Sequence, residues 1–456
     1  FLKIKELFPS LEVKQDVIND EKQIELINSN VSGLRHLTRA LQNVGEGISL
    51  GSEWQEALSW FEENQKDSLD PVKAGLIYIN GQEDLGQQAA EALFKKDINK
   101  AMSLSPSRLE RFSRCPFSHL VAYGLKPEER RIYEAAPREI GDIYHQCLMK
   151  ITEELTKEGI AITAPESPWM TVSKEECYKI IDDEIAKISS EYREGLFEAS
   201  KVDAYRGERV KETARQVCWT AIEQVRAGRI LDIKPEVAFR RGGNIPPIEI
   251  QLDDQKVYIE GIIDRVDYLN DDRIKIIDYK TGNESFSIKE AEDGYRLQLM
   301  LYLQAACEES KKPAGVFYFR IKEPMSELTP DKLDQETVEK EIRKSFKLDG
   351  ILVDDPTVIG DIAGEFEGFS EIVPIRATKE GIKNSGKEGL VTEKEFIELQ
   401  EAVLEKIQEA CQDLINGKIK AYPMKTRDNS ACTYCQYKGI CRFDTVFEGC
   451  KYNIVG

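Results

Sequence analysis

Long apolar runs are absent from this sequence of 456 residues. No stretch approaches the roughly 18 consecutive apolar residues that a membrane-spanning helix needs. The first residues, FLKIKELFPSLEVKQD, also lack the basic, apolar and small-residue regions of a secretory signal peptide. We therefore expect a soluble, cytoplasmic protein that has no membrane partner.

Two short features are missing as well. The sequence contains no G-x-x-x-x-G-K-[ST] motif, so it predicts no ATPase site of its own, and any ATP hydrolysis belongs to a partner or to sequence outside this chain. It does not begin with methionine, and we expect it to be part of a longer polypeptide. Its length predicts two to four units, or one large domain with insertions.

Basic residues are outnumbered by acidic ones. The chain has 63 lysines and arginines against 82 aspartates and glutamates, which gives a formal net charge of −19. A balance this acidic excludes a nucleic-acid coat protein held on by bulk charge. Any DNA contact must come from local basic patches, and Arg108, Arg111 and Arg114 in SPSRLERFSRCP are candidate phosphate contacts.

Cysteine, in contrast, is plentiful, with ten residues. Six are scattered singly, which is typical of small buried apolar residues. Three others form the pattern C-x2-C-x5-C at Cys432, Cys435 and Cys441. Three thiolates this close predict a metal centre rather than disulfides. Zinc and a [4Fe–4S] cluster both accept four thiolates, so the ligand type leaves the metal open.

The fourth thiolate must come from elsewhere in the chain. Ser105 and Pro106 are typical of a helix N-terminus, and Pro116 interrupts that helix directly after Cys115. Cys115 is therefore expected at a rigid break in polar surroundings rather than in an apolar stripe. We expect it to be the fourth ligand, which would join the two ends of one domain.

Helical periodicity dominates residues 1–103 and again the range from about 138 to 230. The second range contains His145, one turn after Gly141, where a glycine leaves room for a ligand or another backbone. Taken alone, a single histidine has a structural role more often than a ligating one. His145 therefore needs support from other residues.

Alternating β-branched residues dominate the next part of the chain. KPEVAFRRG, IEIQLDD, KVYIEGIIDRVDYL and RIKIIDYK are predicted strands, and residues 270–272 form a hairpin turn between the last two. EDGYRLQLMLYLQAACEE is a predicted helix and AGVFYFRI a further strand. This order predicts an α/β fold with a mixed sheet flanked by helices.

The strand RIKIIDYK carries the main candidate site. Alternation places Asp278 and Lys280 on one face after two isoleucines, so this face leaves the core and opens into a cleft. The hairpin partner offers Asp264, and Gly261 before it leaves room for a substrate backbone. Two neighbouring carboxylates repel unless a cation joins them, and Mg²⁺ takes such oxygen ligands. A surface hairpin with solvated charges is the alternative interpretation.

Lys280 and the following helix add polar groups to this cleft. Lys280 can orient or deprotonate a water molecule, or offset the charge that develops on a phosphate. Gln298 and Tyr302 are spaced i and i+4 on an otherwise apolar helix. Polar residues on so apolar a helix need partners, and the cleft above the sheet could supply them.

Four segments, GDIYH, GIIDR, IDYKTG and QLMLY, resemble in order and spacing the successive motifs of the RecB-like branch of the PD-(D/E)XK nucleases. The resemblance implies a restriction-endonuclease-like core that needs Mg²⁺ or Mn²⁺. It implies that the metal is held by His145, Asp264, Asp278 and the carbonyl of Tyr279. It implies that the catalytic residues are Asp264, Asp278, Lys280, Gln298 and Tyr302. Glu236 matches a recurrent acidic position without an assigned role.

The cysteine pattern is part of the same resemblance. One cysteine before the nuclease core and C-x2-C-x5-C after it resemble the iron–sulfur staple of certain members. This implies one [4Fe–4S] cluster rather than zinc, with the cofactor-binding residues Cys115, Cys432, Cys435 and Cys441.

Within this branch, residues 104–456 are most similar to the nuclease-bearing subunits of the bacterial AddAB family of helicase–nucleases. The resemblance implies a nuclease domain at 104–456 with a helical insertion at about 150–230, an acidic insertion at about 325–395 and a cluster-binding segment at 430–445. Residues 1–103 are expected to end a helicase-like region.

The function implied by this resemblance is metal-dependent DNA hydrolysis. The domain would act as an exonuclease on an unwound, single strand of DNA during double-strand break repair by recombination, beside a partner subunit of AddA type. Two alternatives stay open. One is a free-standing RecB-like exonuclease of the CRISPR-associated type, and the other is a catalytically silent nuclease-fold scaffold that binds DNA.

Overall fold

The computed structural model divides the chain into two compact units, Phe1–Asn80 and Gly81–Gly456. The predicted 1–103 segment and the predicted acidic insertion each lie partly outside the described residues. The structure describes residues 25–45, 47–76, 84–95, 101–128, 137–191, 197, 200–243, 245–252, 255–282, 284–307, 311–323, 334–386, 388–427, 429–447 and 449–455.

The first unit contains three described helices, α2 (Asn30–Gly45), α3 (Ser52–Asn64) and α4 (Lys66–Leu76). Their apolar residues recur at helical spacing and meet in a small core of their own around Leu37 and Phe61. All three lie in the range 1–103 that the sequence predicts to be helical, and α4 is helical although it contains Pro71.

The second unit is built on a six-stranded mixed sheet with the strand order β11-β8-β7-β6-β5-β2. The strands β5 and β6 are antiparallel neighbours, whereas β6 and β7 are parallel. The strands of this sheet are β2 (Asp232–Phe239), β5 (Gly261–Tyr268), β6 (Arg273–Lys280), β7 (Lys312–Arg320), β8 (Leu348–Val353) and β11 (Leu390–Val391). The predicted α/β fold with a mixed sheet is therefore confirmed.

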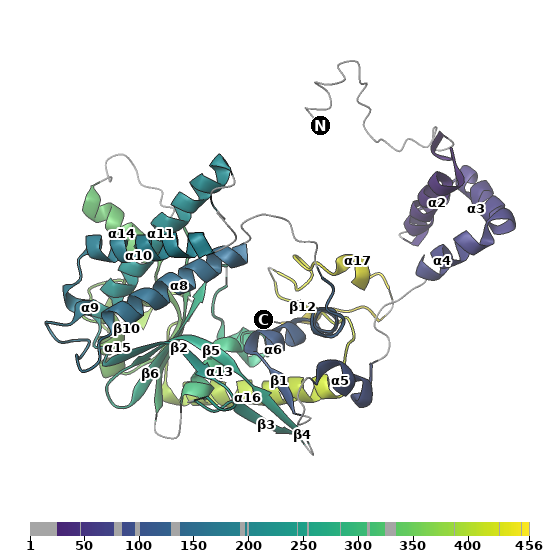
Figure 1. The fold of residues 1–456 in the computed structure, drawn as a ribbon. Helices are drawn as coiled ribbons and strands as arrows, with labels where there is room; N and C mark the ends of the chain where they lie inside the picture. Colours follow the sequence, from purple (N-terminus) through teal and green to yellow (C-terminus); the bar gives the residue numbers. More distant parts are fainter. Residues whose placement is uncertain are drawn as a thin grey trace. The chain divides into compact units, whose positions relative to one another are not determined.

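Helices cover both faces of this sheet (Figure 1). The helix α8 packs on β2 and is itself in contact with α10 and α11, whereas α13 packs on β6 and β7 beside α16. The main helices are α5 (Gln87–Phe94), α6 (Pro106–Arg114), α7 (Pro116–His119), α8 (Pro137–Leu155), α9 (Pro168–Thr171), α10 (Lys174–Glu191), α11 (Lys201–Ala227), α12 (Ile288–Glu292), α13 (Gln298–Ala306), α14 (Gln335–Ser345), α15 (Pro356–Ala363), α16 (Glu393–Ile415) and α17 (Lys438–Cys441). In the part of the chain that the structure describes, no helix combines the length and apolar character needed to cross a bilayer.

The run KVYIEGIIDRVDYL, predicted as one strand, is two strands in two different sheets. The strand β4 (Gln255–Ile259) pairs with β1 (Met102–Leu104) and β3 (Ile248–Leu252), and β5 begins at Gly261 in the large sheet. A Cβ atom at Gly261 would lie 2.9 Å from the Phe239 ring. The glycine therefore permits close packing against Phe239, not the approach of a substrate backbone that the sequence suggested.

The predicted helix EDGYRLQLMLYLQAACEE is shorter than expected. The structure has α12 up to Glu292, a break that contains Gly294 at φ +88°, and α13 from Gln298. A positive φ is available to glycine at little energetic cost, so the chain turns here instead of continuing the helix. As a result, Gln298 lies in the first turn of its helix.

The start and the end of the second unit meet beside α6. Ser105 caps α6, Pro106 is its first residue, and the helix ends before Cys115 and Pro116, as predicted. After α16, the chain forms β12 (Met424–Lys425), α17 and β13 (Asn453–Ile454). This C-terminal segment (yellow in Figure 1) shares a cavity with α6, which brings residues far apart in sequence together.

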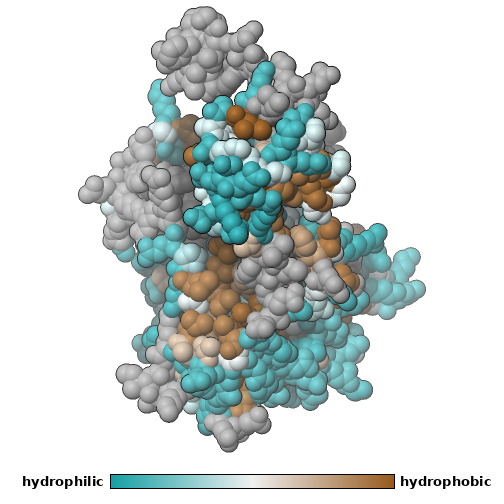
Figure 2. Space-filling view, turned by 90° about the vertical axis from the view of Figure 1, so that its right-hand side faces the viewer, coloured by the Kyte–Doolittle hydropathy of each residue, from teal (hydrophilic) through white to brown (hydrophobic). Residues whose placement is uncertain are grey.

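The remaining strands form a small hairpin, β9 (Ile375–Thr378) with β10 (Gly381–Asn384). The outer surface combines hydrophilic and hydrophobic regions. In Figure 2 hydrophilic residues dominate much of the visible face, and hydrophobic residues gather in separate patches between them.

Candidate active site

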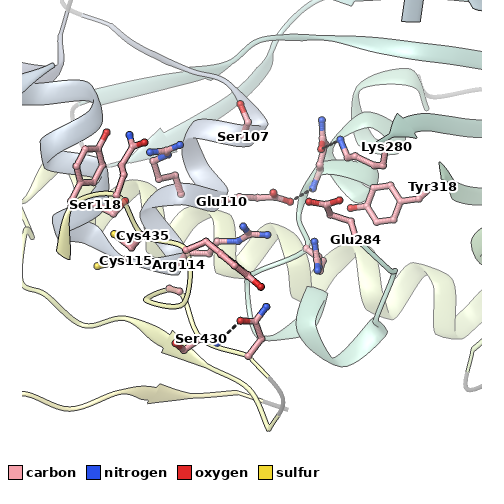
Figure 3. Close-up of a pocket in the computed structure, with 18 residues that line it drawn as sticks. Ser107, Glu110, Arg114, Cys115, Ser118, Lys280, Glu284, Tyr318, Ser430 and Cys435 are labelled. Atoms are coloured by element: carbon pink, nitrogen blue, oxygen red, sulfur yellow. Dashed lines mark hydrogen bonds between the residues drawn. The ribbon is translucent and has the colours of Figure 1, made fainter. Parts of the chain in front are cut away.

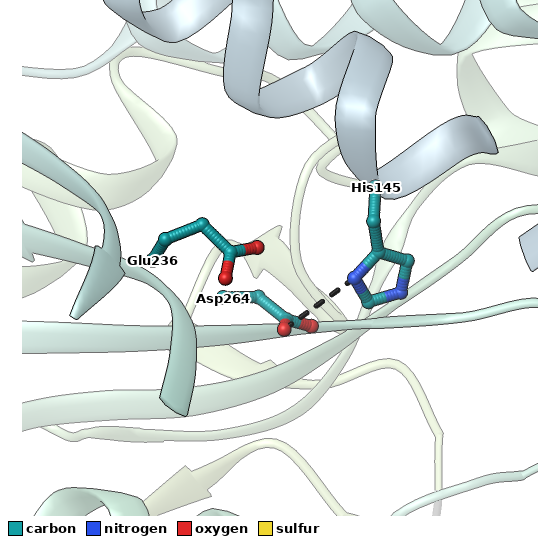
Figure 4. A group of neighbouring side chains, drawn as sticks. All are labelled: His145, Glu236 and Asp264. Carbon is teal, nitrogen blue, oxygen red and sulfur yellow. Dashed lines mark ion pairs between the residues drawn. The ribbon is translucent and has the colours of Figure 1, made fainter. Parts of the chain in front are cut away.

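His145, Glu236 and Asp264 converge at one end of the large sheet (Figure 4). His145 comes from α8, and the two carboxylates come from the paired strands β2 and β5. One ligand atom from each residue lies within 4.8 Å of the others. Nδ1 of His145 lies 3.4 Å from Oδ1 of Asp264. An imidazole nitrogen and two carboxylates at this spacing can hold a divalent cation.

The backbone of Tyr279 fixes two of these side chains. Its amide N–H donates to Oδ2 of Asp264 at 2.7 Å, and its carbonyl lies 3.1 Å from Nε2 of His145. Because a carbonyl only accepts, Nε2 must carry the proton in this contact. Nδ1 is then the nitrogen that faces Asp264 and the cation position. A histidine oriented through its second nitrogen is typical of metal sites.

Glu236 is held in an unfavourable backbone conformation. Its φ is +49°, although it lies inside β2. The residues before and after it pair with Arg265 and Ile263, which leaves Glu236 opposite Asp264. Partial burial and the Asp264 carboxylate raise the pKa of Glu236. Strain and facing like charges are both unfavourable in isolation, and a bound cation would offset the repulsion.

Asp278 and Lys280 form an ion pair at the end of β6. Nζ of Lys280 lies 2.6 Å from Oδ2 of Asp278. Asp278 is only 1% exposed, and its Oδ2 lacks a well-aligned hydrogen bond despite the ion pair. Burial and the nearby Asp264 raise the pKa of Asp278 to about 7, against the opposing effect of Lys280. A buried carboxylate beside a second carboxylate is suited to a bound cation, which would offset the repulsion between the two.

Gln298 and Tyr302 on α13 hold Lys280 from the other side. Oε1 of Gln298 accepts a hydrogen bond from Nζ of Lys280 at 2.8 Å. Nε2 of Gln298 donates to the Tyr302 hydroxyl at 2.6 Å. The polar stripe predicted on this helix therefore has partners, and its nearest partner is the lysine. Tyr302 is buried and packs edge-on against Phe239.

The four cysteines selected from the sequence lie near one another. Burial, and after it the charges of Cys432 and Cys435, raise the pKa of Cys115 to about 11. Burial, followed by the charges of Cys115, Cys432 and Cys435, raises the pKa of Cys441 to about 11. Cys115 is buried and the other three are half-buried. The structure thus brings the thiol of Cys115, between α6 and α7, together with three thiols of the C-terminal segment.

A cavity of about 520 Å³ connects the cysteines to Lys280. Figure 3 shows Cys115 and Cys435 at one end, Lys280 and Tyr318 at the other, and Glu110 between them. The cavity is also lined by Arg111, Arg114, Glu284, Arg296, Gln298 and Tyr434. A ligand in this cavity would therefore contact the lysine of the candidate active site.

The family model of the PD-(D/E)XK nuclease superfamily matches residues 103–442, which is most of the chain. The chain belongs to this superfamily. The matched range contains every strand of the six-stranded sheet and all the residues described above. Nucleases of this superfamily generally use divalent metal ions, which agrees with the group formed by His145, Glu236 and Asp264.

Residues 19–72 match the fifth-domain model of the ATP-dependent helicase/deoxyribonuclease AddB. The chain is 32% identical to a subunit of the ATP-dependent helicase/deoxyribonuclease of Alkaliphilus metalliredigens and to that of Alkaliphilus oremlandii, and 31% identical to that of Clostridium novyi. These matches cover 99% of the chain but only 39 to 40% of each relative. The chain thus spans about two fifths of their length.

The sequence left two residues of this site without a role. Glu236 was noted only as an acidic position, and its place opposite Asp264 depends on strand pairing. Glu110 was given no role in the site. In the structure it accepts hydrogen bonds from the backbone of α13. No local pattern predicts this contact, because 187 residues separate Glu110 from Leu297.

Proposed function

We propose that this chain contains a DNA nuclease domain that hydrolyses phosphodiester bonds with Mg²⁺ or Mn²⁺. The observation that carries the proposal is the convergence of His145, Glu236 and Asp264 around one point, with the Asp278–Lys280 ion pair near Asp264. Superfamily membership and the similarity to named deoxyribonuclease subunits support it.

The side chains present fit a divalent metal. Asp264, Asp278 and Nδ1 of His145 would hold it, with Glu236 as an additional ligand and the Tyr279 carbonyl nearby. Oxygen donors, an oriented imidazole and two neighbouring aspartates, whose repulsion a cation would offset, are the features that support this set. When bound, the metal would supply positive charge for the phosphate and activate water.

Lys280 is placed to act on the scissile phosphate. Asp278 and Gln298 hold its ammonium group at the edge of the cavity. A fixed positive charge there can stabilise the negative charge that develops on the phosphate. Gln298 and Tyr302 keep the lysine in position, and through the lysine they would also influence how DNA is placed.

The four thiols are proposed to hold a [4Fe–4S] cluster that staples the domain. Four thiolates can hold either tetrahedral zinc or a [4Fe–4S] cluster. The arrangement of one cysteine before the nuclease core and C-x2-C-x5-C after it, which resembles the iron–sulfur staple, favours the cluster.

The complete assembly is proposed to be a helicase–nuclease that processes DNA ends in double-strand break repair. The nuclease would degrade a single strand released by a helicase, with a partner subunit of AddA type. The match of residues 19–72 to the AddB fifth domain favours this over a free-standing exonuclease of the CRISPR-associated type. Residues 1–103 would then end the helicase-like region.

The test is an exonuclease assay on single-stranded DNA with Mg²⁺, comparing the wild type with Asp278→Ala. We expect Asp278→Ala to lower the rate by at least about a hundredfold while the fold stays intact by circular dichroism. Equal rates in the two proteins would contradict the catalytic assignment. No cleavage by either protein, even with its partner subunit and ATP, would favour the silent scaffold.

The cluster has its own test. Anaerobically purified protein should be brown, absorb broadly near about 400 nm and contain about four iron atoms per chain. Colourless protein with one zinc per chain would contradict the cluster.

A further inference from the structure

The helix α6 carries arginines whose charge is not neutralised within the described residues. Arg111 and Arg114 line the cavity of about 520 Å³, and no described carboxylate lies within ion-pair distance of either one. Nε of Arg114 is buried and has no hydrogen-bond partner. In a chain with a net charge of −19, acidic partners are abundant. Arginines that have no acidic partner in such a chain indicate a site for an external anion.

The carboxylates of the cavity do not cancel this charge. Oε1 of Glu110 accepts hydrogen bonds from two backbone amides of α13 instead of pairing with an arginine. The other acidic residue that lines the cavity is Glu284. Lys280 and Arg296 also line the cavity, but they pair with Asp278 and Glu290, which do not line it. Arg111 and Arg114 are therefore the cations of the lining that keep no carboxylate partner among the described residues.

The wall of the cavity opposite α6 carries an aromatic side chain that is not packed in the protein core. Tyr434, between Cys432 and Cys435, is 93% exposed. Its neighbour Tyr437 is buried, so the segment as a whole is packed. An exposed tyrosine beside unpaired arginines is a combination typical of surfaces that bind unpaired nucleic-acid bases.

We propose that this cavity binds the single strand of DNA next to the scissile phosphate. Arg111 and Arg114 bind consecutive phosphates, and Tyr434 stacks on a base between the cysteine segment and Lys280. Duplex DNA does not fit this site, because its bases are already stacked and paired and none is free to stack on Tyr434. The inference rests on the proposed nuclease function, since Lys280 at the end of the cavity supplies the point of cleavage.

Binding can be measured separately from cleavage. A fluorescent oligo(dT) is titrated with the Asp278→Ala variant of the chain at several salt concentrations. Fluorescence anisotropy gives the binding constant K at each concentration. Arg111→Ala with Arg114→Ala should reduce the slope of log K against log salt by about 1.4, since each phosphate contact on single strands contributes about 0.7. The matched control is Arg376→Ala, which removes an exposed arginine of β9 without changing the cavity.

Tyr434 has its own pair of variants. Tyr434→Ala should weaken binding roughly tenfold, whereas Tyr434→Phe keeps the ring and should bind like the parent protein. Tyr205→Ala, which removes another exposed tyrosine, serves as the control. A loss with Tyr434→Phe as large as with Tyr434→Ala would overturn stacking.

The outcomes separate this inference from the proposed function. Cleavage by the wild type, with an unchanged salt slope for the double arginine variant, overturns the DNA-binding cavity and leaves the nuclease intact. Arginine-dependent binding without cleavage supports the cavity and contradicts the nuclease. Equal or tighter binding of a blunt duplex overturns the single-strand assignment.

A second inference rests on the contacts of Glu110. Its Oε1 accepts hydrogen bonds from the backbone N–H groups of Leu297 and Gln298 at 2.9 and 3.0 Å. Gln298 in turn accepts from Lys280. The first amides of a helix have no partner within the helix, and a carboxylate there stabilises its first turn. The geometry points to Glu110 as a positioning residue for Lys280.

The test compares Glu110→Ala with Glu110→Gln in the nuclease assay. Glu110→Gln keeps an oxygen at the acceptor position and should retain most of kcat. Glu110→Ala should lower kcat by roughly tenfold or more with little change in KM, because Gln298 loses its anchor. Glu110→Asp shortens the side chain by one methylene group and moves the oxygens away from the two amides, so it should also lower kcat. If Glu110→Ala does not fold, Glu110→Asp takes its place in the comparison.

Two outcomes would overturn the positioning role. One is an unchanged kcat in Glu110→Ala. The other is a Glu110→Gln variant as slow as Glu110→Ala, since the charge and not the acceptor would then matter.

Discussion

Glu236 shows how one residue can be unfavourable for folding and favourable for function. It combines φ +49° with a like charge directly across the strand pair. Strained residues of this kind persist where the surrounding structure holds them, and they gather at functional sites. Glu236 is therefore expected to lower the stability of the metal-free protein and to contribute to the site when a cation is bound.

Glu236→Gln should have opposite effects on metal dependence and on stability. We expect the Mg²⁺ concentration for half-maximal cleavage to rise by roughly tenfold or more, because a ligand charge is lost. Without metal, the free energy of unfolding should rise by about 0.5 kcal/mol or less, since repulsion from Asp264 is relieved. Mg²⁺ titrations and urea denaturation in EDTA measure the two effects.

Glu367→Gln is the matched control, since Glu367 is exposed and lies outside the site. An unchanged Mg²⁺ requirement in Glu236→Gln would remove Glu236 from the metal site.

His119 is buried beside α6 and should make stability depend on pH. Nε of Arg108 donates to its Nε2 at 3.0 Å, so His119 must accept there. Burial, followed by the charges of Arg108 and Arg111, lowers the pKa of His119 to about 3. The unfolded chain, with a histidine pKa of about 6.5, binds this proton first as the pH falls. Stability therefore falls from about pH 6.5 towards pH 3.

His119→Gln keeps an acceptor near the Nε2 position and cannot be protonated. Between about pH 6 and pH 4, the wild type should lose up to about 1.4 kcal/mol per pH unit relative to this variant. Urea denaturation at a series of pH values measures the difference. Parallel curves for the two proteins would show that His119 does not titrate on unfolding.

At the scale of elements, the strands β5 and β6 share a buried network of charges. Asp267 lies 2.6 Å from Nε of Arg265 and 2.7 Å from Nζ of Lys275, and all three are buried. The two cations lower the pKa of Asp267 against the effect of burial. Removing one member of such a network leaves buried charges unpaired.

Asp267→Asn should lower the free energy of unfolding by roughly 3–5 kcal/mol. The control is Asp272→Asn in the β5–β6 hairpin, where the side chain is 70% exposed, and its effect should stay within about 0.5 kcal/mol. Urea denaturation compares the two variants. Similar small effects in both would mean that the sheet does not depend on the network.

The elements that sequence could predict are those fixed by their own residues. The cap at Ser105 and the break at Cys115 are local, and both are confirmed. The start of α13 is not local, because the amides of its first turn are bonded by Glu110 from a distant helix. The pairing of Glu236 with Asp264 depends likewise on the register of β2 against β5.

At the scale of the whole molecule, strands from distant segments complete one sheet. The strands β8 and β11, from the range predicted as an acidic insertion, extend the six-stranded sheet beside β7. Sequence alone predicted the class of fold and the motif residues, because these follow from periodicity and resemblance. It could not place β8 and β11, since strand order depends on contacts between distant segments.

The cysteine site is expected to stabilise the second unit as a whole. Cys115 and Cys432 are roughly 300 residues apart in sequence. Joining such distant points lowers the conformational entropy of the unfolded chain. On the entropy model used for cross-links, this stabilises the folded state by up to about 5 kcal/mol. Iron removal or Cys435→Ser should therefore lower the midpoint of thermal unfolding.

Cys450→Ser provides the matched control for this last prediction. Cys450 lies in the same C-terminal segment and is half-buried like Cys435, but it is outside the proposed ligand set. We expect Cys435→Ser to lose iron, visible absorbance and thermal stability together, and Cys450→Ser to keep all three. Because both changes replace one half-buried thiol by a hydroxyl, equal losses in the two variants would show that the ligand set is wrong.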